Sequence, residues 1–446
     1  MQPEHRAQPG SQPGGWGSGQ QYGQPAGQPA ARAASRPDGS SAGQGTAASA
    51  QQPPSVPPQV DPQTAGAGSV PTTSPTTSSR MTVPGYPSGP AAPAEEKVDT
   101  GPLPSRETLR REARAASSRR GAGDADVERA GELLKSVANI FSQRVVGQEQ
   151  LRRALVTALM SSGHILLESV PGLAKTTAAQ TLASAVSGSF RRIQCTPDLM
   201  PNDIVGTQIL NSSTGEMTTQ LGPVHANIVL LDEINRSSAK TQSAMLEAMQ
   251  ERQTSIGGVV YPLPHPFMVL ATQNPIEEEG TYVLPEAQMD RFLMKEVLTY
   301  PRPSEEADVL DRISNGTFDQ PVTGRPISTD DVEWLQRAAE RVYVDPVIKQ
   351  YIVALINTSR GGGPRPVPGL DRQVRVGASP RGGIALMKVA QAVALQEGRT
   401  YVIPDDVRLL RHGVLRHRLV LTYDALADGV APEAIIDAIF AAVPTP

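Results

Sequence analysis

The sequence predicts an α/β fold in which a parallel sheet flanked by helices is followed by a smaller all-α domain and preceded by a long disordered tail. Three observations support this prediction. Two continuous apolar runs, 227–231 and 266–272, end in polar residues, which is typical of buried parallel strands. After residue 300 the apolar spacing becomes mainly helical. The first quarter of the chain is rich in proline and glycine and lacks aliphatic runs, so it cannot bury enough apolar surface to fold.

A strand-loop-helix segment between residues 165 and 177 carries the strongest chemical signal. An apolar strand enters a short loop that ends at Lys175-Thr176 and opens a helix. Inward backbone N–H groups, a lysine charge and a hydroxyl on Mg2+ together hold a triphosphate, and such a segment supplies all three. We therefore expect ATP and Mg2+ as cofactors, with Lys175 on the β- and γ-phosphates and Thr176 on the metal. The residues expected to line the phosphates are Val170, Pro171, Gly172, Leu173, Ala174, Lys175, Thr176 and Thr177.

This loop departs from the usual glycine-rich pattern at two positions. Ser169 stands at the first glycine, and Ala174 stands at the glycine before the lysine. Alanine adds a methyl group where the backbone often needs unusual dihedral angles, so either the loop keeps to a conformation that alanine tolerates or phosphate affinity suffers. Taken alone, the segment is also compatible with an ordinary strand-turn-helix that exposes a lysine.

The apolar run 227–231 is closed by two carboxylates, Asp232 and Glu233. Ligands bind at the carboxyl-terminal edge of a parallel sheet. If this strand lies near the phosphate loop, Asp232 would position Mg2+, usually through water, and Glu233 would orient and deprotonate the attacking water. The alternative is that the two acidic residues cap the amphipathic helix expected at 240–250.

Two further polar segments complete the expected site. Asn274 follows the strand 266–272 and could hold the water against the γ-phosphate, although Asn-Pro is also a common turn signal. Val146, Gly147 and Gln148 precede a helix ahead of the core and are candidates for contacts with the base, although a simple linker into that helix explains them almost equally well.

Read in order, these residues resemble the MoxR family of AAA+ ATPases, from about Val145 to the C-terminus. The resemblance lies in whole strings, at 194–201, 232–236, 240–251, 271–275, 285–292 and 378–381. It implies that Arg291 is an arginine finger that reaches the ATP of the neighbouring subunit, and that Arg381 is a sensor-2 arginine that reports nucleotide state to the lid. Without the family, Arg291 would be read as a surface salt-bridge partner and Arg381 as a helix-start residue.

Two segments read as β-hairpins, 208–219 with its turn at Thr214-Gly215 and 253–261 with its turn at Gly257-Gly258. They fit the helix-2-insert branch of AAA+ proteins, which the MoxR family resembles. In a ring such hairpins can face the pore or a partner. As isolated units they would be ordinary sheet decorations.

The expected organisation has three parts: a disordered tail and basic linker at 1–125, a nucleotide-binding α/β domain at 126–300, and a helical lid at 301–446. The helices expected in the lid are 331–344, 345–359, 382–396, 404–418 and 432–442.

Composition narrows the partners and the compartment. The formal net charge is −4 and no basic stripe stands out in the expected core, so nucleic acid is not the favoured partner. A single cysteine excludes an intramolecular disulfide framework. No apolar stretch approaches the ~20 residues that a membrane span needs, and the N-terminus lacks an apolar signal region. We expect a cytoplasmic protein.

The resemblance also implies a biological role. AAA+ proteins of this type form rings, most often hexamers, and MoxR-like proteins act as chaperone-like remodellers. They assist the maturation or activation of client proteins or the insertion of cofactors, commonly alongside proteins with von Willebrand factor A domains. The alternatives are a nucleic-acid translocase and a nucleotide-switched scaffold with little turnover. The hairpin at 253–261 offers no basic residue nearby except Arg252, which counts against the translocase.

Overall fold

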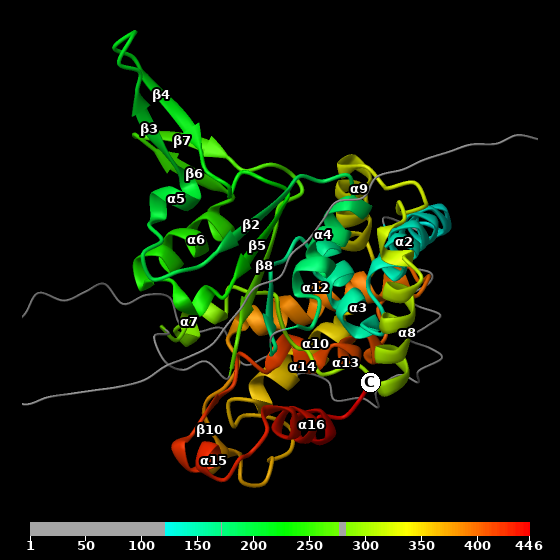
Figure 1. Cartoon of the computed structure of the whole chain (residues 1–446). Helices are drawn as coiled ribbons and strands as arrows, with labels where there is room; N and C mark the ends of the chain where they lie inside the picture. Colours follow the sequence, from blue (N-terminus) through cyan, green and yellow to red (C-terminus); the bar gives the residue numbers. More distant parts are fainter. Residues whose placement is uncertain (1–120, 171, 276–281) are drawn as a thin grey trace, which may run out of the picture. The chain divides into compact units, whose positions relative to one another are not determined.

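The computed structural model describes residues 121–446 except 171 and 276–281, and its centre is a five-stranded parallel sheet. The strand order is β2-β5-β8-β1-β9, and every neighbouring pair runs parallel. Helices cover both faces of the sheet (Figure 1). The predicted α/β fold is therefore confirmed. The strands are β1 Ile165–Glu168, β2 Phe190–Gln194, β5 Ile228–Asp232, β8 Met268–Gln273 and β9 Met294–Val297.

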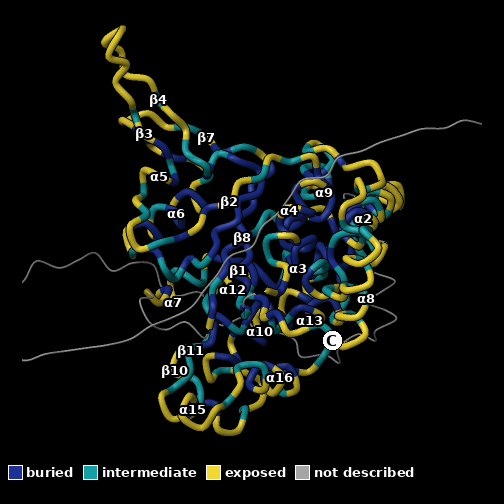
Figure 2. The backbone as a smooth tube through the Cα atoms, viewed as in Figure 1, coloured by how far each residue is buried: buried dark blue, intermediate teal, exposed yellow. Residues whose placement is uncertain are grey.

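The central strands are apolar throughout because both of their faces are buried. On β5, Ile228 and Leu230 pack into one hydrophobic cluster, whereas Val229 and Leu231 pack into the other. Side chains alternate between the faces of a strand, so a run without polar interruption is what a doubly covered sheet requires. Figure 2 shows the central strands mainly in the colour of buried residues.

The two faces are covered by different helices. The first cluster receives apolar side chains from α2, α3, α4 and the lid, and the second receives them from α5 and α6. The helix expected at 240–250 is α6, and η1 is a short 3-10 turn between β5 and α6. The bounds are α2 Asp124–Arg144, α3 Glu149–Met160, α4 Lys175–Ala185, α5 Pro201–Val205, η1 Ile234–Arg236, α6 Ala239–Glu251 and α7 Glu286–Met289.

Both predicted hairpins are present and project from the α5 and α6 side of the sheet (Figure 1). They are β3 Gly206–Leu210 with β4 Met217–Leu221, and β6 Gln253–Ile256 with β7 Val259–Pro262. Gly257 and Gly258 both have positive φ, as the tight turn between β6 and β7 requires. The Tyr261 hydroxyl of β7 donates to Thr219 Oγ1 of β4 at 2.9 Å, so the two hairpins contact each other.

The lid is mostly helical, with two corrections to the prediction. The helix expected at 404–418 is two helices, because the buried Leu410 leaves the helical conformation at φ −112°, ψ 24°. The lid is also not all-α, because β10 Val374–Val376 pairs antiparallel with β11 Val420–Leu421, where β-branched residues favour strands. The lid helices are α8 Pro303–Ser314, η2 Thr317–Asp319, α9 Thr329–Glu340, α10 Pro346–Thr358, α11 Leu370–Gln373, α12 Pro380–Gln396, α13 Pro404–Leu409, α14 Arg411–Leu415, α15 Tyr423–Ala427 and α16 Pro432–Ala442.

The lid packs on the sheet domain through α12 and α14. Helix α12 contacts α2 and α3, and α14 contacts the edge strand β9. Apolar residues of both parts belong to one hydrophobic cluster. Across the described residues, no helix combines the length and the apolarity needed to cross a bilayer.

A buried histidine ties three of these elements together. His164 lies directly before β1, its Nδ1 accepts the N–H of Val269 on β8 at 3.0 Å, and its Nε2 lies 3.1 Å from the carbonyl of Met249 on α6. Because Nδ1 accepts, the proton of the neutral ring sits on Nε2. Burial, and secondarily the charge of Arg252, lower the pKa of His164 to about 4.

Replacing His164 with glutamine should flatten the acid side of the stability curve. The folded pKa lies below the unfolded value of about 6.5, so this stability is fully present above pH 6.5 and is lost as the pH falls towards 4. The complete loss is about 3 kcal/mol. Urea unfolding across this range should show that the free energy of unfolding falls more steeply with decreasing pH for the wild type than for His164→Gln. The difference in slope should correspond to the uptake of up to about one proton on unfolding. Parallel curves would contradict this assignment.

Candidate active site

The loop between β1 and α4 has the backbone of a phosphate-binding turn. Gly172 has φ +87°, and a Cβ built there meets no atom within 4 Å. Lys175 and Thr176 are the first two residues of α4, where the N–H groups of the first turn and the helix dipole favour an anion. The Lys175 ammonium donates to the carbonyl of Ser169 at 3.4 Å, so the lysine folds back over the loop. Val170 precedes the turn and is half-buried, and Pro171 lies outside the described residues.

The structure shows which backbone conformation Ala174 adopts. Ala174 has φ 53° and ψ 24°, a left-handed conformation, immediately before α4. Thus the loop keeps the conformation that glycine usually supplies, and the alanine methyl group costs about 1–2 kcal/mol there. The departure from glycine changes the strain in the loop rather than its path.

A cavity of about 820 Å³ adjoins this loop. From the predicted set it is lined by Val146, Gln148, Gly172, Leu173, Ala174 and Thr177. Gly147 lines the adjoining cavity of about 530 Å³ and has φ +68°, and a Cβ there would collide with the Glu305 side chain at 2.5 Å. The segment 146–148 therefore forms a wall of a cavity and is more than a linker into α3.

The sequence prediction missed the opposite wall of this cavity. Tyr300, Val309, Leu310 and Phe318 line it from the segment that enters the lid. Leu310 is 64% exposed, and α8 has an apolar side although none of its residues is buried. An amphipathic helix without a buried partner is a signal for a binding surface, but it becomes visible only when burial is known.

Asp232 and Glu233 lie at the carboxyl-terminal edge of the sheet, as does the phosphate loop. Strand β8 lies between β5 and β1, so the two motifs are separated by two strand spacings, roughly 10 Å. The Thr272 hydroxyl at the end of β8 donates to Asp232 Oδ1 at 2.8 Å and accepts the N–H of Glu233 at 2.8 Å. Thr272 is fully buried and fixes both carboxylate residues, and the sequence prediction did not single it out.

The capping alternative for the two carboxylates is wrong. Helix α6 is capped by Ser238, whose Oγ accepts the N–H of Thr241 at 3.3 Å. Glu233 instead starts the 3-10 turn η1 with φ 58° and ψ 53°, a left-handed conformation for a residue with a bulky side chain. Strained backbone of this kind persists where the surrounding contacts fix it and is frequent at functional sites.

Strand β2 supplies the remaining contacts of the two carboxylates. Arg192 donates to Asp232 Oδ2 from Nε at 3.0 Å and to Gln194 Oε1 at 2.8 Å. Because the oxygen of Gln194 faces Arg192, its amide nitrogen faces Glu233 and donates to Oε2 at 2.9 Å. Arg236 also pairs with that oxygen at 3.2 Å. Asn274 is buried just beyond the end of β8, on the same edge.

The two predicted arginines lie together but away from the phosphate loop. Arg291 and Arg381 line a pocket of about 250 Å³ that shares no lining residue with the 820 Å³ cavity. Arg291 follows α7 and donates to the carbonyl of Leu246 at 3.2 Å, and Arg381 is the second residue of α12. The other cationic residues around this pocket are Arg252, Lys388 and Arg418.

Comparison with known proteins agrees with this geometry. The sequence matches the family described as "ATPase family associated with various cellular activities (AAA)" over residues 164–294 and the "AAA lid domain" over residues 370–439. It is 48% identical over 302 residues to Chaperone MoxR1 of Mycobacterium tuberculosis, covering 68% of this chain and 79% of that protein. It is 31% identical over 328 residues to Protein MoxR of Methylorubrum extorquens, covering 69% and 93%.

Solved structures point the same way. The crystal structure of a candidate ATPase from Cytophaga hutchinsonii matches with a TM-score of 0.67 at 40% identity, covering 75% of this chain and 99% of that one. The fold, the loop and the matched regions define an ATPase of the AAA class with its lid. Within that class, the chain belongs to the MoxR family.

Replacing Ala174 with glycine should stabilise the protein by up to about 1 kcal/mol. The change removes a left-handed penalty of about 1–2 kcal/mol and adds about 0.5–1 kcal/mol of backbone entropy to the unfolded chain. The matched control is Ala438→Gly in the exposed interior of the right-handed helix α16, which should lose about 1 kcal/mol. Urea unfolding of the three proteins measures both shifts, and equal destabilisation of the two variants would contradict the strain.

Proposed function

We propose that the protein hydrolyses ATP at the carboxyl-terminal edge of its sheet, as a subunit of a ring that remodels client proteins. The observation that carries the proposal is that the residues expected to bind and hydrolyse ATP lie in one place, whereas the two predicted arginines lie in another. Lys175 and Thr176 share one edge of the sheet with Asp232 and Glu233, beside a cavity large enough for a nucleotide. Arg291 and Arg381 line a separate pocket, which shares no lining residue with that cavity.

Each residue of the edge has a task that follows from its place. The N–H groups of 172–177 and the Lys175 ammonium would bind the phosphates, and the walls of the 820 Å³ cavity would hold the base. Glu233 would take the proton of the attacking water, with Asn274 on the same edge to hold that water. Thr272 fixes Glu233 through its backbone, and Gln194 and Arg236 hold its side chain.

The residues present also fit Mg2+, which would neutralise charge on the phosphates. Mg2+ keeps most of its waters and takes only one or two protein oxygens at such sites. The Thr176 hydroxyl at the start of α4 and the Asp232 carboxylate, 8% exposed, are the oxygens that would bind it. Because Asp232 Oδ1 accepts from Thr272 and Oδ2 accepts from Arg192, we expect Asp232 to act through water, unless Arg192 is displaced.

The separation of the arginine pocket supports assembly into a ring, most often a hexamer in AAA+ proteins. Transfer of a phosphoryl group needs positive charge on the transferred oxygens. Arg291 and Arg381 supply such charge only if they face the nucleotide of another copy. A head-to-tail contact of this kind closes into a ring.

Two features support a protein rather than a nucleic acid as the client. The hairpins contain no lysine or arginine between 206 and 221 or between 253 and 262. Their exposed side chains are neutral or acidic instead, and the apolar ones among them include Ile209, Leu210 and Met217. A nucleic-acid track needs basic side chains, so the translocase is disfavoured. The relative named Chaperone MoxR1 supports a chaperone-like role. For the form of this role we propose maturation, activation or cofactor insertion of client proteins, with a von Willebrand factor A domain protein as partner, as the family resemblance implies.

Glu233→Gln should retain ATP binding and lose turnover. The amide keeps the shape of the side chain but cannot take a proton, so we expect phosphate release to fall by about 100-fold or more. Steady-state phosphate release measures turnover, and a fluorescent ATP analogue measures affinity. Equal phosphate release by the variant and the wild type would contradict the hydrolytic role and favour the scaffold.

Turnover per subunit should rise with protein concentration. Dilution separates the subunits and removes Arg291 from the neighbouring site, so dilute protein should lose activity, and Arg291→Ala should be inactive at every concentration. Phosphate release and the sedimentation coefficient are measured on the same protein at each concentration, so that turnover can be compared with the degree of assembly. Constant turnover per subunit from monomer to assembly would contradict completion of the site by a neighbour.

A further inference from the structure

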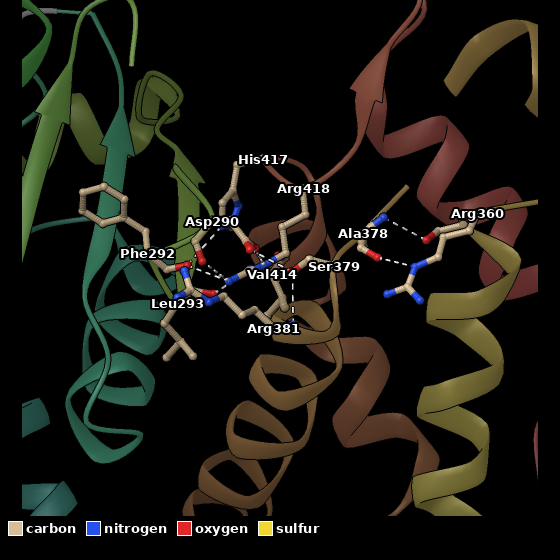
Figure 3. Close-up of polar contacts among 11 residues, drawn as sticks. Asp290, Phe292, Leu293, Arg360, Ala378, Ser379, Arg381, Val414, His417 and Arg418 are labelled. Carbon is tan, nitrogen blue, oxygen red and sulfur yellow. Dashed lines mark hydrogen bonds and ion pairs between the residues drawn. The ribbon is translucent and has the colours of Figure 1, made fainter. Parts of the chain in front are cut away.

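The lid is bonded to the short segment that carries Arg291. Arg418 lies between α14 and β11, is only 6% exposed, and directs its guanidinium at residues 290–293 (Figure 3). Its Nε pairs with Asp290 Oδ1 at 2.8 Å, and its two terminal nitrogens donate to the carbonyls of Phe292 at 2.7 Å and Leu293 at 3.1 Å. The backbone on either side of Arg291 is therefore fixed by one lid residue.

The carboxylate of Asp290 extends this contact to the second arginine. Asp290 Oδ2 accepts a hydrogen bond from the Ser379 hydroxyl at 2.8 Å. The same hydroxyl accepts a hydrogen bond from the backbone N–H of Arg381 at 3.1 Å (Figure 3). Ser379 is the N-cap of α12. A continuous chain of hydrogen bonds therefore runs from Arg418 through Asp290 and Ser379 to Arg381.

This chain is costly to bury, which argues that it fixes geometry. Burial lowers the pKa of Arg418 to about 10, against the opposing effect of Asp290, so the guanidinium stays charged at neutral pH. A buried ion pair contributes little net stability compared with apolar packing, and its best-attested use is to specify one arrangement. The planar guanidinium fork meets one carboxylate and several carbonyls at fixed angles, which a lysine cannot do.

We propose that Arg418 is a positioning residue, which acts through Asp290 and Ser379 to hold Arg291 and Arg381 in one arrangement, so that both reach the neighbouring nucleotide together. This inference rests on the proposed function in a ring. It also makes the lid part of the unit that acts on the neighbour, because α12, Arg418 and residues 290–293 form one connected body.

The test uses Arg418→Lys in the full chain, which keeps the charge and loses the fork. We expect kcat to fall by about tenfold or more, while the affinity of a fluorescent nucleotide and ring assembly stay within about twofold of the wild type. The matched control is Arg411→Lys in the same lid, whose guanidinium pairs with Asp437, and it should keep wild-type turnover. Loss of assembly or of nucleotide affinity in Arg418→Lys would mark a purely structural role and overturn the inference.

Mixed rings separate a defect in the arginines from a defect in the nucleotide site. Lys175→Ala subunits lose their own site but keep intact arginines for a neighbour. Mixed in equal amounts with Arg418→Lys subunits, they should restore about a quarter of wild-type turnover, because a site works only when an Arg418→Lys subunit faces a Lys175→Ala one. No recovery in this mixture would overturn the inference.

A second mixture distinguishes failure of this inference from failure of the proposed function. Arg291→Ala mixed with Lys175→Ala should recover in the same way if the finger acts on a neighbour. Recovery there without recovery for Arg418→Lys overturns only the positioning role, and recovery in neither overturns the ring mechanism with it. If Arg418→Lys fails to fold, the test uses Ser379→Ala, which removes the link between Asp290 and Arg381 together with the N-cap of α12. This variant must show a lower kcat and the same recovery, and an unchanged kcat overturns the inference.

Discussion

The site depends on one constraint, which is that parallel strands end on the same edge of a sheet. The phosphate loop follows β1, the two carboxylates lie at the end of β5, and Asn274 follows β8, so all of them lie at that edge. Their apolar residues are buried on both faces, so a shift of register by one residue would turn every side chain to the opposite face. Hydrophobic burial thus sets the positions of the polar residues that follow each strand.

A second layer of contacts refines these positions. Thr272 bonds Asp232 and the backbone of Glu233, and Arg192 and Gln194 approach the same pair from β2. Both carboxylates are therefore held before any ligand binds, and preorganisation of this kind is the main contribution that a protein can make to phosphoryl transfer. The left-handed backbone at Glu233, directly after β5, and at Ala174, directly before α4, is compatible with this view, because strained backbone persists where surrounding contacts fix it.

The motif residues could be predicted from the sequence because each stands at a fixed offset from a strongly apolar run. Strands β1, β5 and β8, the hairpins at Gly215 and Gly257 and most lid helices follow from local periodicity and turn chemistry in the same way, whereas β2 and β9 were not predicted. Thr272 and Arg418 could not be singled out, because their importance arises from contacts with residues 40 and 128 positions distant. Leu310 was missed for the same reason, because it lines a cavity together with residues between 144 and 177. Local rules also failed at Leu410, where tertiary packing divides a helix that the pattern alone would continue.

The arrangement of charge supports the proposal that a neighbouring copy completes the site. At the phosphate edge Lys175 faces the ligand site while Arg192 and Arg236 are paired with the two carboxylates, whereas the pocket with Arg291 and Arg381 gathers several cations around Asp290. Cations in one pocket repel each other, and this cost is offset when an anion enters. A neighbouring nucleotide is such an anion, so assembly and ligand binding stabilise the same contact. Because Arg418 joins the lid to this pocket, a change in the lid of one subunit of the proposed ring would alter the contacts of the pocket with the nucleotide of the next subunit.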